Sequence, residues 1–354
     1  MALLPLLLLL LLRLVASAPA SSPATALFVL GDSTASCAAT TLPLNVSFTS
    51  SGPCLFPSGR RLLPDLLAAK MGLPPPPLVS TLNGTAVEAA KGVNFAEAEE
   101  GARGMIFRMG AVGQQLRLAT ETLQQLRLEA ATPQDADSAA AGAVFVLSFG
   151  TDAYARLLAR GPEADASAPK HGRRGFGRLL ADRVARTVAE LYEAGARRTV
   201  VMGVAPLGCA PRVMWEGLHL VDGRSCVDEA NELVQGYNAR LAAQLEALRP
   251  RLPGADIVFC DIYKAMMEMI THPARYGFDE ARKACCGLGP FGGTIGCFTK
   301  EMVCPTPQRH VWWDLYSATE AASSLVANWS WSAHSSVCQP INLETLTGHT
   351  SFSY

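Results

Sequence analysis

The sequence predicts an α/β fold in which helices cover both faces of a five-stranded parallel sheet. Apolar runs alternate with segments of helical periodicity along most of the chain. The runs are continuously apolar instead of alternating with polar residues, as is typical of parallel strands buried on both faces. No long linker or internal repeat divides the 354 residues, so we expect a single domain over residues 19–354.

Five short strands and four main helices are expected in chain order. The strands are predicted at Ala26–Leu30, Val93–Ala96, Val144–Phe149, Thr199–Val204 and Asp256–Cys260. The helices are predicted at Leu62–Lys70, Val112–Leu128, Leu179–Ala194 and Asn231–Leu248. The Ala-rich segment Ala130–Ala143 is interpreted as a connection into the next strand.

Three polar positions follow the first three predicted strands. They are Ser33, the segment 97–101 and Asp152. In a parallel sheet, ligands bind beyond the carboxyl ends of the strands. We therefore expect these residues to gather at one edge of the sheet.

The first residues are typical of a secretory signal. An apolar run covers residues 3–12, and Ala16-Ser17-Ala18 fits a cleavage site, which predicts a signal peptide over residues 1–18. The run is too short for a membrane span of about 20 residues, so no transmembrane anchor is expected; an uncleaved anchor is the alternative. The predicted location is extracellular or in a cell wall.

Composition supports this location and excludes some partners. Ten cysteines in a secreted chain favour disulfides, and Cys285-Cys286 with Cys297 and Cys304 is expected to hold a long loop together. Lys and Arg total 30 against 31 Asp and Glu, so no net field attracts nucleic acid. Three sequons predict glycosylation at Asn45, Asn83 and Asn328, or unmodified surface asparagines otherwise.

Two separated motifs carry the clearest chemistry. Phe28–Leu30 runs into the turn Gly31-Asp32-Ser33, and Asp314-Leu315-Tyr316-Ser317 lies near the C-terminus. Between them come Gly92–Ala96, Leu147–Tyr154, Gly203–Pro211, Cys226 with Asn231 and Asn238, Asp261–Tyr263, Tyr276–Phe278 and Cys285–Gly287. In type and order these blocks resemble those of the plant GDSL esterase/lipase family, part of the SGNH-hydrolase superfamily. The resemblance implies the flavodoxin-like SGNH fold and hydrolysis of ester bonds in lipids or acylated wall polymers, without a cofactor.

The resemblance also implies roles for single residues. Ser33 takes the position of the nucleophile and Asp314 that of the acid. The base, a histidine three residues after the acid, is replaced by Ser317, whose hydroxyl does not hold a proton near neutral pH. His310 is four residues before Asp314, roughly 13 Å away in an extended chain. The other five histidines lie in expected loops or tails.

The residues that would bind the developing oxyanion are changed as well. The Gly-Gly of the family's second block aligns with Ala98-Glu99, and the asparagine of the third block aligns with Asp152. An ionised aspartate only accepts hydrogen bonds, so it repels an oxyanion where a donor is needed.

The altered first block leaves further alternatives open. Cys37 and Cys54 are a candidate disulfide across the mouth of the site, or two unrelated thiols. Asp32 and Asp314 have a structural role as the alternative to a catalytic one. The carboxylates near the site offer oxygen ligands for a hard cation, but glutamates pointing into water are the simpler interpretation, and no metal is predicted.

Two functions compete at this stage. The first is a secreted protein of this family with ester hydrolysis impaired or lost, which keeps a groove for a small acyl, lipid or glycan ligand or for a protein partner. The alternative is an active carboxylic ester hydrolase that uses Ser33 with an unrecognised base.

Overall fold

The structure is a computed structural model that describes residues 23–36, 61–82, 86–96, 109–158, 172–217, 226–297, 299–332 and 335–348. Its centre is one sheet with the strand order β1-β2-β3-β4-β5. The strands are β1 (Leu27–Gly31), β2 (Val144–Ser148), β3 (Arg198–Met202), β4 (Asp256–Cys260) and β5 (Cys338–Gln339). The first four run parallel, and β5 is antiparallel to β4. The predicted α/β class with a five-stranded sheet is confirmed; the sheet was predicted to be parallel and is mostly so, because β5 is antiparallel.

The fifth strand is not the predicted one. Residues 93–96 form no regular strand: Asn94 makes isolated bridges to Val29 and Leu78. The main chain of Val29 in β1 bonds Val93 and Phe95, at 2.9 and 2.8 Å, and the Asn94 side chain bonds the main chain of Ala35 and Ala96, at 2.8 and 2.9 Å. The remaining place in the sheet is taken by β5, which is too short for a pattern to indicate it.

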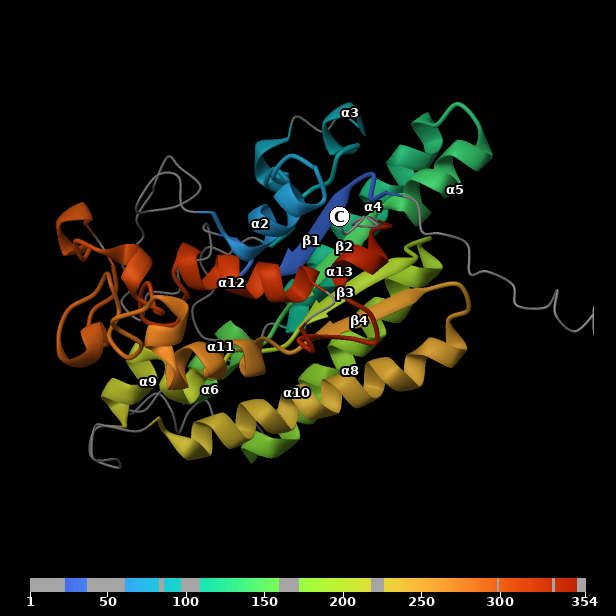
Figure 1. The fold of residues 1–354 in the computed structure, drawn as a ribbon. Helices are drawn as coiled ribbons and strands as arrows, with labels where there is room; N and C mark the ends of the chain where they lie inside the picture. The colour runs from blue at the N-terminus through green and yellow to red at the C-terminus, as the bar shows by residue number, and fades with distance from the viewer. Residues whose placement is uncertain are drawn as a thin grey trace, which may run out of the picture.

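Helices surround the sheet in two groups. The α-helices are α2 (Leu63–Lys70), α3 (Ala86–Ala89), α4 (Met109–Glu129), α5 (Pro133–Gly142), α6 (Thr151–Leu158), α8 (Gly172–Glu193), α9 (Pro211–Glu216), α10 (Asp228–Leu248), α11 (Ile262–Thr271), α12 (Glu320–Trp331) and α13 (Leu343–Leu346). Helix α8 packs on α10, while α12 packs on α2 and α11. The sheet lies between these two groups (Figure 1).

Short 3₁₀ helices connect several of these elements. They are η1 (Val79–Thr81), η2 (Leu207–Cys209), η3 (Arg249–Arg251), η4 (Pro273–Tyr276), η5 (Pro290–Gly292), η6 (Lys300–Met302) and η7 (Pro307–Arg309). None of the helices in the described part of the chain is both long and apolar enough to span a bilayer.

One predicted connection is a helix. Residues 133–142 form α5, because Pro133 occupies its first turn and the Thr132 hydroxyl accepts a bond of 3.1 Å from the amide of Asp135. Proline in the first turn and a threonine cap are both strong start signals. The alanines that follow are good helix formers, so this segment continues the helix.

The core lies on both faces of the strands. Every residue of β1 and β3 is buried, as in parallel strands that are covered on both faces. Phe28 stacks on Phe145 of the neighbouring strand, with ring centroids 5.1 Å apart, and on Phe95 at 6.3 Å. This aromatic contact fixes β1 immediately before the Gly-Asp-Ser turn.

Disulfides join segments far apart in sequence. All eight described cysteines are paired, as Cys209–Cys226, Cys260–Cys338, Cys285–Cys304 and Cys286–Cys297. Cys260–Cys338 links β4 to β5, and the two adjacent cysteines Cys285 and Cys286 hold the long loop after α11. The expectation of disulfides is confirmed for these residues; Cys37 and Cys54 lie outside the described part.

Candidate active site

The Gly-Asp-Ser turn is held by the side chain of Asp32. Its Oδ1 accepts bonds from the hydroxyl of Thr34 at 2.8 Å and from the Thr34 amide at 3.2 Å. Its Oδ2 accepts from the amides of Gly150 at 2.9 Å and Asp152 at 3.2 Å. Asp32 therefore ties the end of β1 to the start of α6.

Ser33 and Asp152 meet across this junction. The Ser33 hydroxyl donates a hydrogen bond to Asp152 Oδ1, and the Ser33 amide donates to Asp152 Oδ2 at 3.2 Å. The strand order brings them together at the carboxyl ends of β1 and β2, where the sequence predicted them to gather. One carboxylate thus holds both hydrogen-bond donors of the serine.

The environment changes the titration of Asp152. As a whole residue it keeps some accessible surface, but its carboxylate is withdrawn from water. This burial, together with the like charge of Asp32, raises the pKa of Asp152 from 3.8 to about 7. The bonds from Ser33 and the charge of Arg156 act in the opposite direction. Burial also raises the pKa of Asp32.

Asp314 organises its own loop. Its Oδ1 accepts bonds from the amides of Tyr316 at 3.1 Å and Ser317 at 2.8 Å. The Ser317 carbonyl accepts from the Trp313 amide at 2.7 Å, which closes the turn. Among the described residues, no hydrogen bond joins Ser33 to Asp314 or to Ser317. The two halves of the predicted site are therefore not bonded to one another.

The loop nevertheless lies near Asp152. Burial raises the pKa of Tyr316, and the negative charges of Glu216, Asp152 and Asp314 raise it further. Because such effects fall off with distance, Tyr316 lies within electrostatic reach of Asp152. Its phenol stays neutral at ordinary pH.

Comparisons with known proteins show the family of this chain. Residues 27–330 match the family model described as GDSL-like Lipase/Acylhydrolase. The chain belongs to this family. It is 30% identical over 336 residues to GDSL esterase/lipase At1g71250 of Arabidopsis thaliana, covering 91% of this chain and 88% of that one. It is 29% identical over 304 residues to GDSL esterase/lipase 7 of the same plant, with 82% of each covered. Membership of the GDSL family supports ester hydrolysis as the broad function.

The histidine that the GDSL family places after the acid has no described substitute at Ser33. His310 turns toward its own loop, with Nδ1 3.1 Å from the Thr306 carbonyl and 3.6 Å from Cys304 Sγ. His272 is exposed and lies 3.6 Å from Glu268. The other four histidines, His171, His219, His334 and His349, lie outside the described residues.

Several other predicted positions lie outside the described residues. They are Ala98 and Glu99 of the oxyanion-hole positions, Asn45 and Asn83 of the sequons, and the signal peptide. Asn328 is described and exposed on α12. Its sequon partner Ser330 is fully buried, and its hydroxyl has no partner among the described residues.

Four buried amide side chains bond the main chain at the ends of β1 and β3 or just after them, and their role was not predicted. Gln115 of α4 pairs with both main-chain groups of Gly31, at 2.8 and 2.9 Å. Asn94 holds Ala35, as described above. Asn231 accepts a 2.9 Å bond from Gly208, and Asn238 pairs with both main-chain groups of Val204 at 2.9 Å. The sequence contains a signal for Gln115, because this polar residue interrupts the apolar helix face formed by Val112, Leu116 and Ala119.

The described residues contain one group of side chains whose potential metal-ligand atoms lie close together, namely Cys285, Cys304 and His310. This group is not open to a metal ion. Its two sulfurs are bonded to each other, so neither is a free thiolate. Both oxygens of Asp32 already accept bonds from amides or a hydroxyl.

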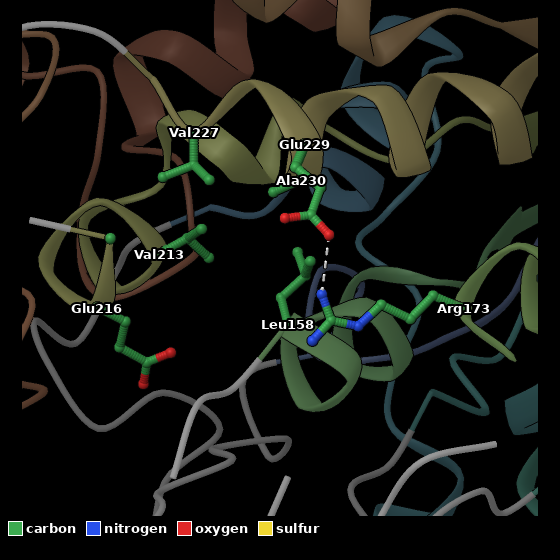
Figure 2. A pocket seen from close by; sticks show the side chains of 8 residues that line it. Leu158, Arg173, Val213, Glu216, Val227, Glu229 and Ala230 are labelled. Carbon is green, nitrogen blue, oxygen red and sulfur yellow. Dashed lines mark hydrogen bonds and ion pairs between the residues drawn. The ribbon is translucent and has the colours of Figure 1, made fainter. Parts of the chain in front are cut away.

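A shallow depression lies away from Ser33. It is lined by Leu158, Arg173, Val213, Glu216, Gly217, Val227, Glu229 and Ala230. Figure 2 shows Arg173 of α8 reaching toward Glu229 of α10, to which it is paired at 3.2 Å. Leu158 ends α6, whereas Asp152 lies in its first turn, and six helical residues span roughly 9 Å. Neither Ser33 nor Asp152 lines this depression.

Proposed function

We propose that this chain is a secreted GDSL-family glycoprotein in which ester hydrolysis by the serine–histidine route is strongly impaired. Its site keeps a binding role for a small acyl, lipid or glycan ligand or for a protein partner. The observation that carries the proposal is the capture of both Ser33 donors by the Asp152 carboxylate.

The missing base is the first part of the argument. A serine needs an acceptor for its proton and, later, a donor for the leaving group, and histidine does both near neutral pH. Ser317 occupies the position of the histidine, and Asp314 Oδ1 accepts hydrogen bonds from two amides of its own loop. Losing the serine's base alone removes up to about 10⁶ in rate.

The oxyanion site is the second part. The amide of Ser33, which would stabilise a developing oxyanion, donates instead to Asp152 Oδ2. When Asp152 is ionised, its carboxylate repels a second negative oxygen at this position. Loss of a single oxyanion donor typically lowers the rate by about 10²–10³.

The cysteines support the proposed location. Four disulfides among the described residues fit an oxidising compartment such as the secretory pathway or the cell surface. A signal peptide over residues 1–18, a single domain over 19–354 and glycans at Asn45, Asn83 and Asn328 complete the proposal.

Restoring the lost groups tests the proposal. The wild-type chain is compared with the triple variant Asp152→Asn, Ser317→His and Glu99→Gly in hydrolysis of p-nitrophenyl butyrate, each with a Ser33→Ala control. We expect background turnover from the wild type and Ser33-dependent turnover from the triple variant. Fast wild-type turnover that disappears in Ser33→Ala would contradict the proposal.

Binding is measured separately from turnover. An alkyl ether analogue of the ester cannot be hydrolysed, so calorimetry with this analogue measures ligand binding without turnover. A matched pair, Ser33→Ala and Ser33→Leu, separates loss of the hydroxyl from filling of the space. The proposed binding role predicts weaker binding in the leucine variant than in the alanine variant.

A further inference from the structure

We propose that Asp152 is the proton acceptor of Ser33, so that the two residues form a serine–carboxylate dyad able to accept an acyl group slowly from an activated ester. The inference rests on the proposed function, because loss of the histidine route leaves this carboxylate as the group bonded to the nucleophile. It gives Asp152 a catalytic role in place of a merely obstructive one.

Geometry is the first requirement for a general base. The base has to lie within hydrogen-bonding reach of the proton that it removes. The Ser33 hydroxyl already donates to Asp152 Oδ1. The second bond, from the Ser33 amide to Oδ2 at 3.2 Å, fixes the rotation of the carboxylate.

Asp32 positions the base from behind. Its Oδ2 accepts the amide of Asp152 at 3.2 Å and that of Gly150 at 2.9 Å, at the first turn of α6. The same side chain holds the turn that carries Ser33, through Thr34. Nucleophile and base are therefore oriented by one half-buried residue, Asp32.

Basicity is the second requirement. An ordinary carboxylate is too weak a base for a serine hydroxyl, and a base is most effective when its pKa lies near the working pH. Burial and the neighbouring Asp32 raise the pKa of Asp152 to about 7. The bonds from Ser33 and the charge of Arg156, one turn along α6, act in the opposite direction. Tyr316, on the loop after Asp314, has its own pKa raised by the charge of Asp152 and stays neutral.

The proposed reaction has two steps, which are acylation of Ser33 and hydrolysis of the acyl-serine. Ser33 Oγ attacks the ester carbonyl carbon while its proton passes to Asp152 Oδ1. The bond from that carbon to the alkoxy oxygen then breaks, and Asp152 returns the proton to the leaving alcohol. Water next attacks the acyl-serine and gives a proton to Asp152, which protonates Ser33 Oγ as the carboxylic acid leaves.

Proton transfer also has a second effect. Once Asp152 is neutral, its oxygens accept hydrogen bonds less strongly than a carboxylate does. The bond from the Ser33 amide, at 3.2 Å the longer of the serine's two contacts, is then weakened. The amide becomes available to the oxyanion at the moment when the oxyanion forms. With few other donors, the reaction is expected to stay slow.

The test measures covalent labelling of Ser33 by an alkyl fluorophosphonate between about pH 5.5 and 9, by intact-mass spectrometry. We expect the wild-type rate to rise with pH to a plateau, with a midpoint near 7. Asp152→Asn should label about 100-fold more slowly and without this step. Glu246→Gln neutralises an exposed carboxylate on α10 and should behave as wild type. Ser33→Ala should not react.

A second measurement avoids dependence on one variant. Asp32→Asn removes the like charge beside Asp152, so the midpoint of the wild-type step should move to lower pH. A purely structural role for Asp32 would change the rate without moving the midpoint. Thermal melting of each variant checks that it is folded.

The outcomes separate the two proposals. Labelling of Asp152→Asn as fast as or faster than wild type would show that the carboxylate only obstructs Ser33, which overturns the dyad and leaves the proposed function standing. Absence of wild-type labelling at every pH has the same meaning. Fast ester turnover by the wild type that Asp152→Asn leaves unchanged would instead overturn the proposed function, because another group would be the base.

Discussion

Replacing Asp152 with asparagine should stabilise the protein, and more so at alkaline pH. In the unfolded chain this carboxyl titrates near its ordinary pKa of 3.8, whereas in the folded protein its pKa is about 7. Between these values the folded state keeps a proton that the unfolded state has lost. Stability therefore falls as the pH rises through this window, and the full cost is present above pH 7.

The magnitude follows from the shift. Each pKa unit corresponds to about 1.4 kcal/mol, so the shift from 3.8 to about 7 costs at most about 4 kcal/mol above pH 7. Asparagine carries no charge and avoids this cost. Its amide accepts only one of the two Ser33 bonds, a loss of about 1 kcal/mol that is the same at every pH.

Urea unfolding at two pH values measures the effect. The difference in unfolding free energy between Asp152→Asn and wild type should be about 3 kcal/mol more favourable at pH 8.5 than at pH 4.5. Carboxyl groups distant from Asp152 titrate alike in both proteins and cancel in this comparison. The neighbouring Asp32 does not, but removing the like charge beside it changes the difference in the same direction. An equal difference at the two pH values would refute the reasoning, because Asp152 would then titrate normally in the folded protein.

Three further predictions concern stability and modification. Gln115→Leu leaves the amide and carbonyl of Gly31 unpaired and should lower the free energy of unfolding in urea by about 2–4 kcal/mol. The exposed control Gln114→Leu should be nearly neutral, and equal effects of the two variants would contradict the role of Gln115. Serine replacement of the Cys260–Cys338 pair, 78 residues apart, should cost about 4 kcal/mol against about 3 kcal/mol for Cys286–Cys297, 11 residues apart, and a reversed order in denaturation would contradict the chain-entropy argument. Ser330→Ala removes an unpaired buried hydroxyl, so it should raise the melting temperature of unglycosylated protein slightly and remove one glycan mass from protein secreted by a eukaryotic host. An unchanged glycan mass would show that Asn328 is not modified.

Much of the fold was predictable because long apolar periodicities mark it. The strands before Ser33 and Asp152 appear as continuous buried runs, and their carboxyl ends had to meet at one edge. β5 was not predictable, because it has two residues and depends on pairing with β4. Helix α8 begins at Gly172, seven residues before its predicted start, because its first turns contain glycine and arginine instead of an apolar stripe.

For the site, the sequence anticipated that Ser33 and Asp152 meet at one edge of the sheet, but not their chemistry. The motifs placed Ser33 and Asp152 together and indicated that Ser317 removes the base. They did not show that one carboxylate takes both donors of the serine. They also did not show that Asp152 titrates near neutral pH, because this depends on burial and on the proximity of Asp32, 120 residues away in sequence. The residue therefore changes from a plain obstacle into a candidate base.

The position of β1 at the border of the sheet has a consequence for solubility. The outward amides of Leu27, Val29 and Gly31 are taken by Lys91, Val93 and Gln115, at 3.2, 2.9 and 2.8 Å. An uncovered apolar border of this kind invites strand addition from a second molecule. The Gln115 contact, which holds the start of the nucleophile turn, thus also helps to prevent intermolecular pairing. A substitution that breaks these bonds should therefore cause self-association in addition to any loss of catalysis.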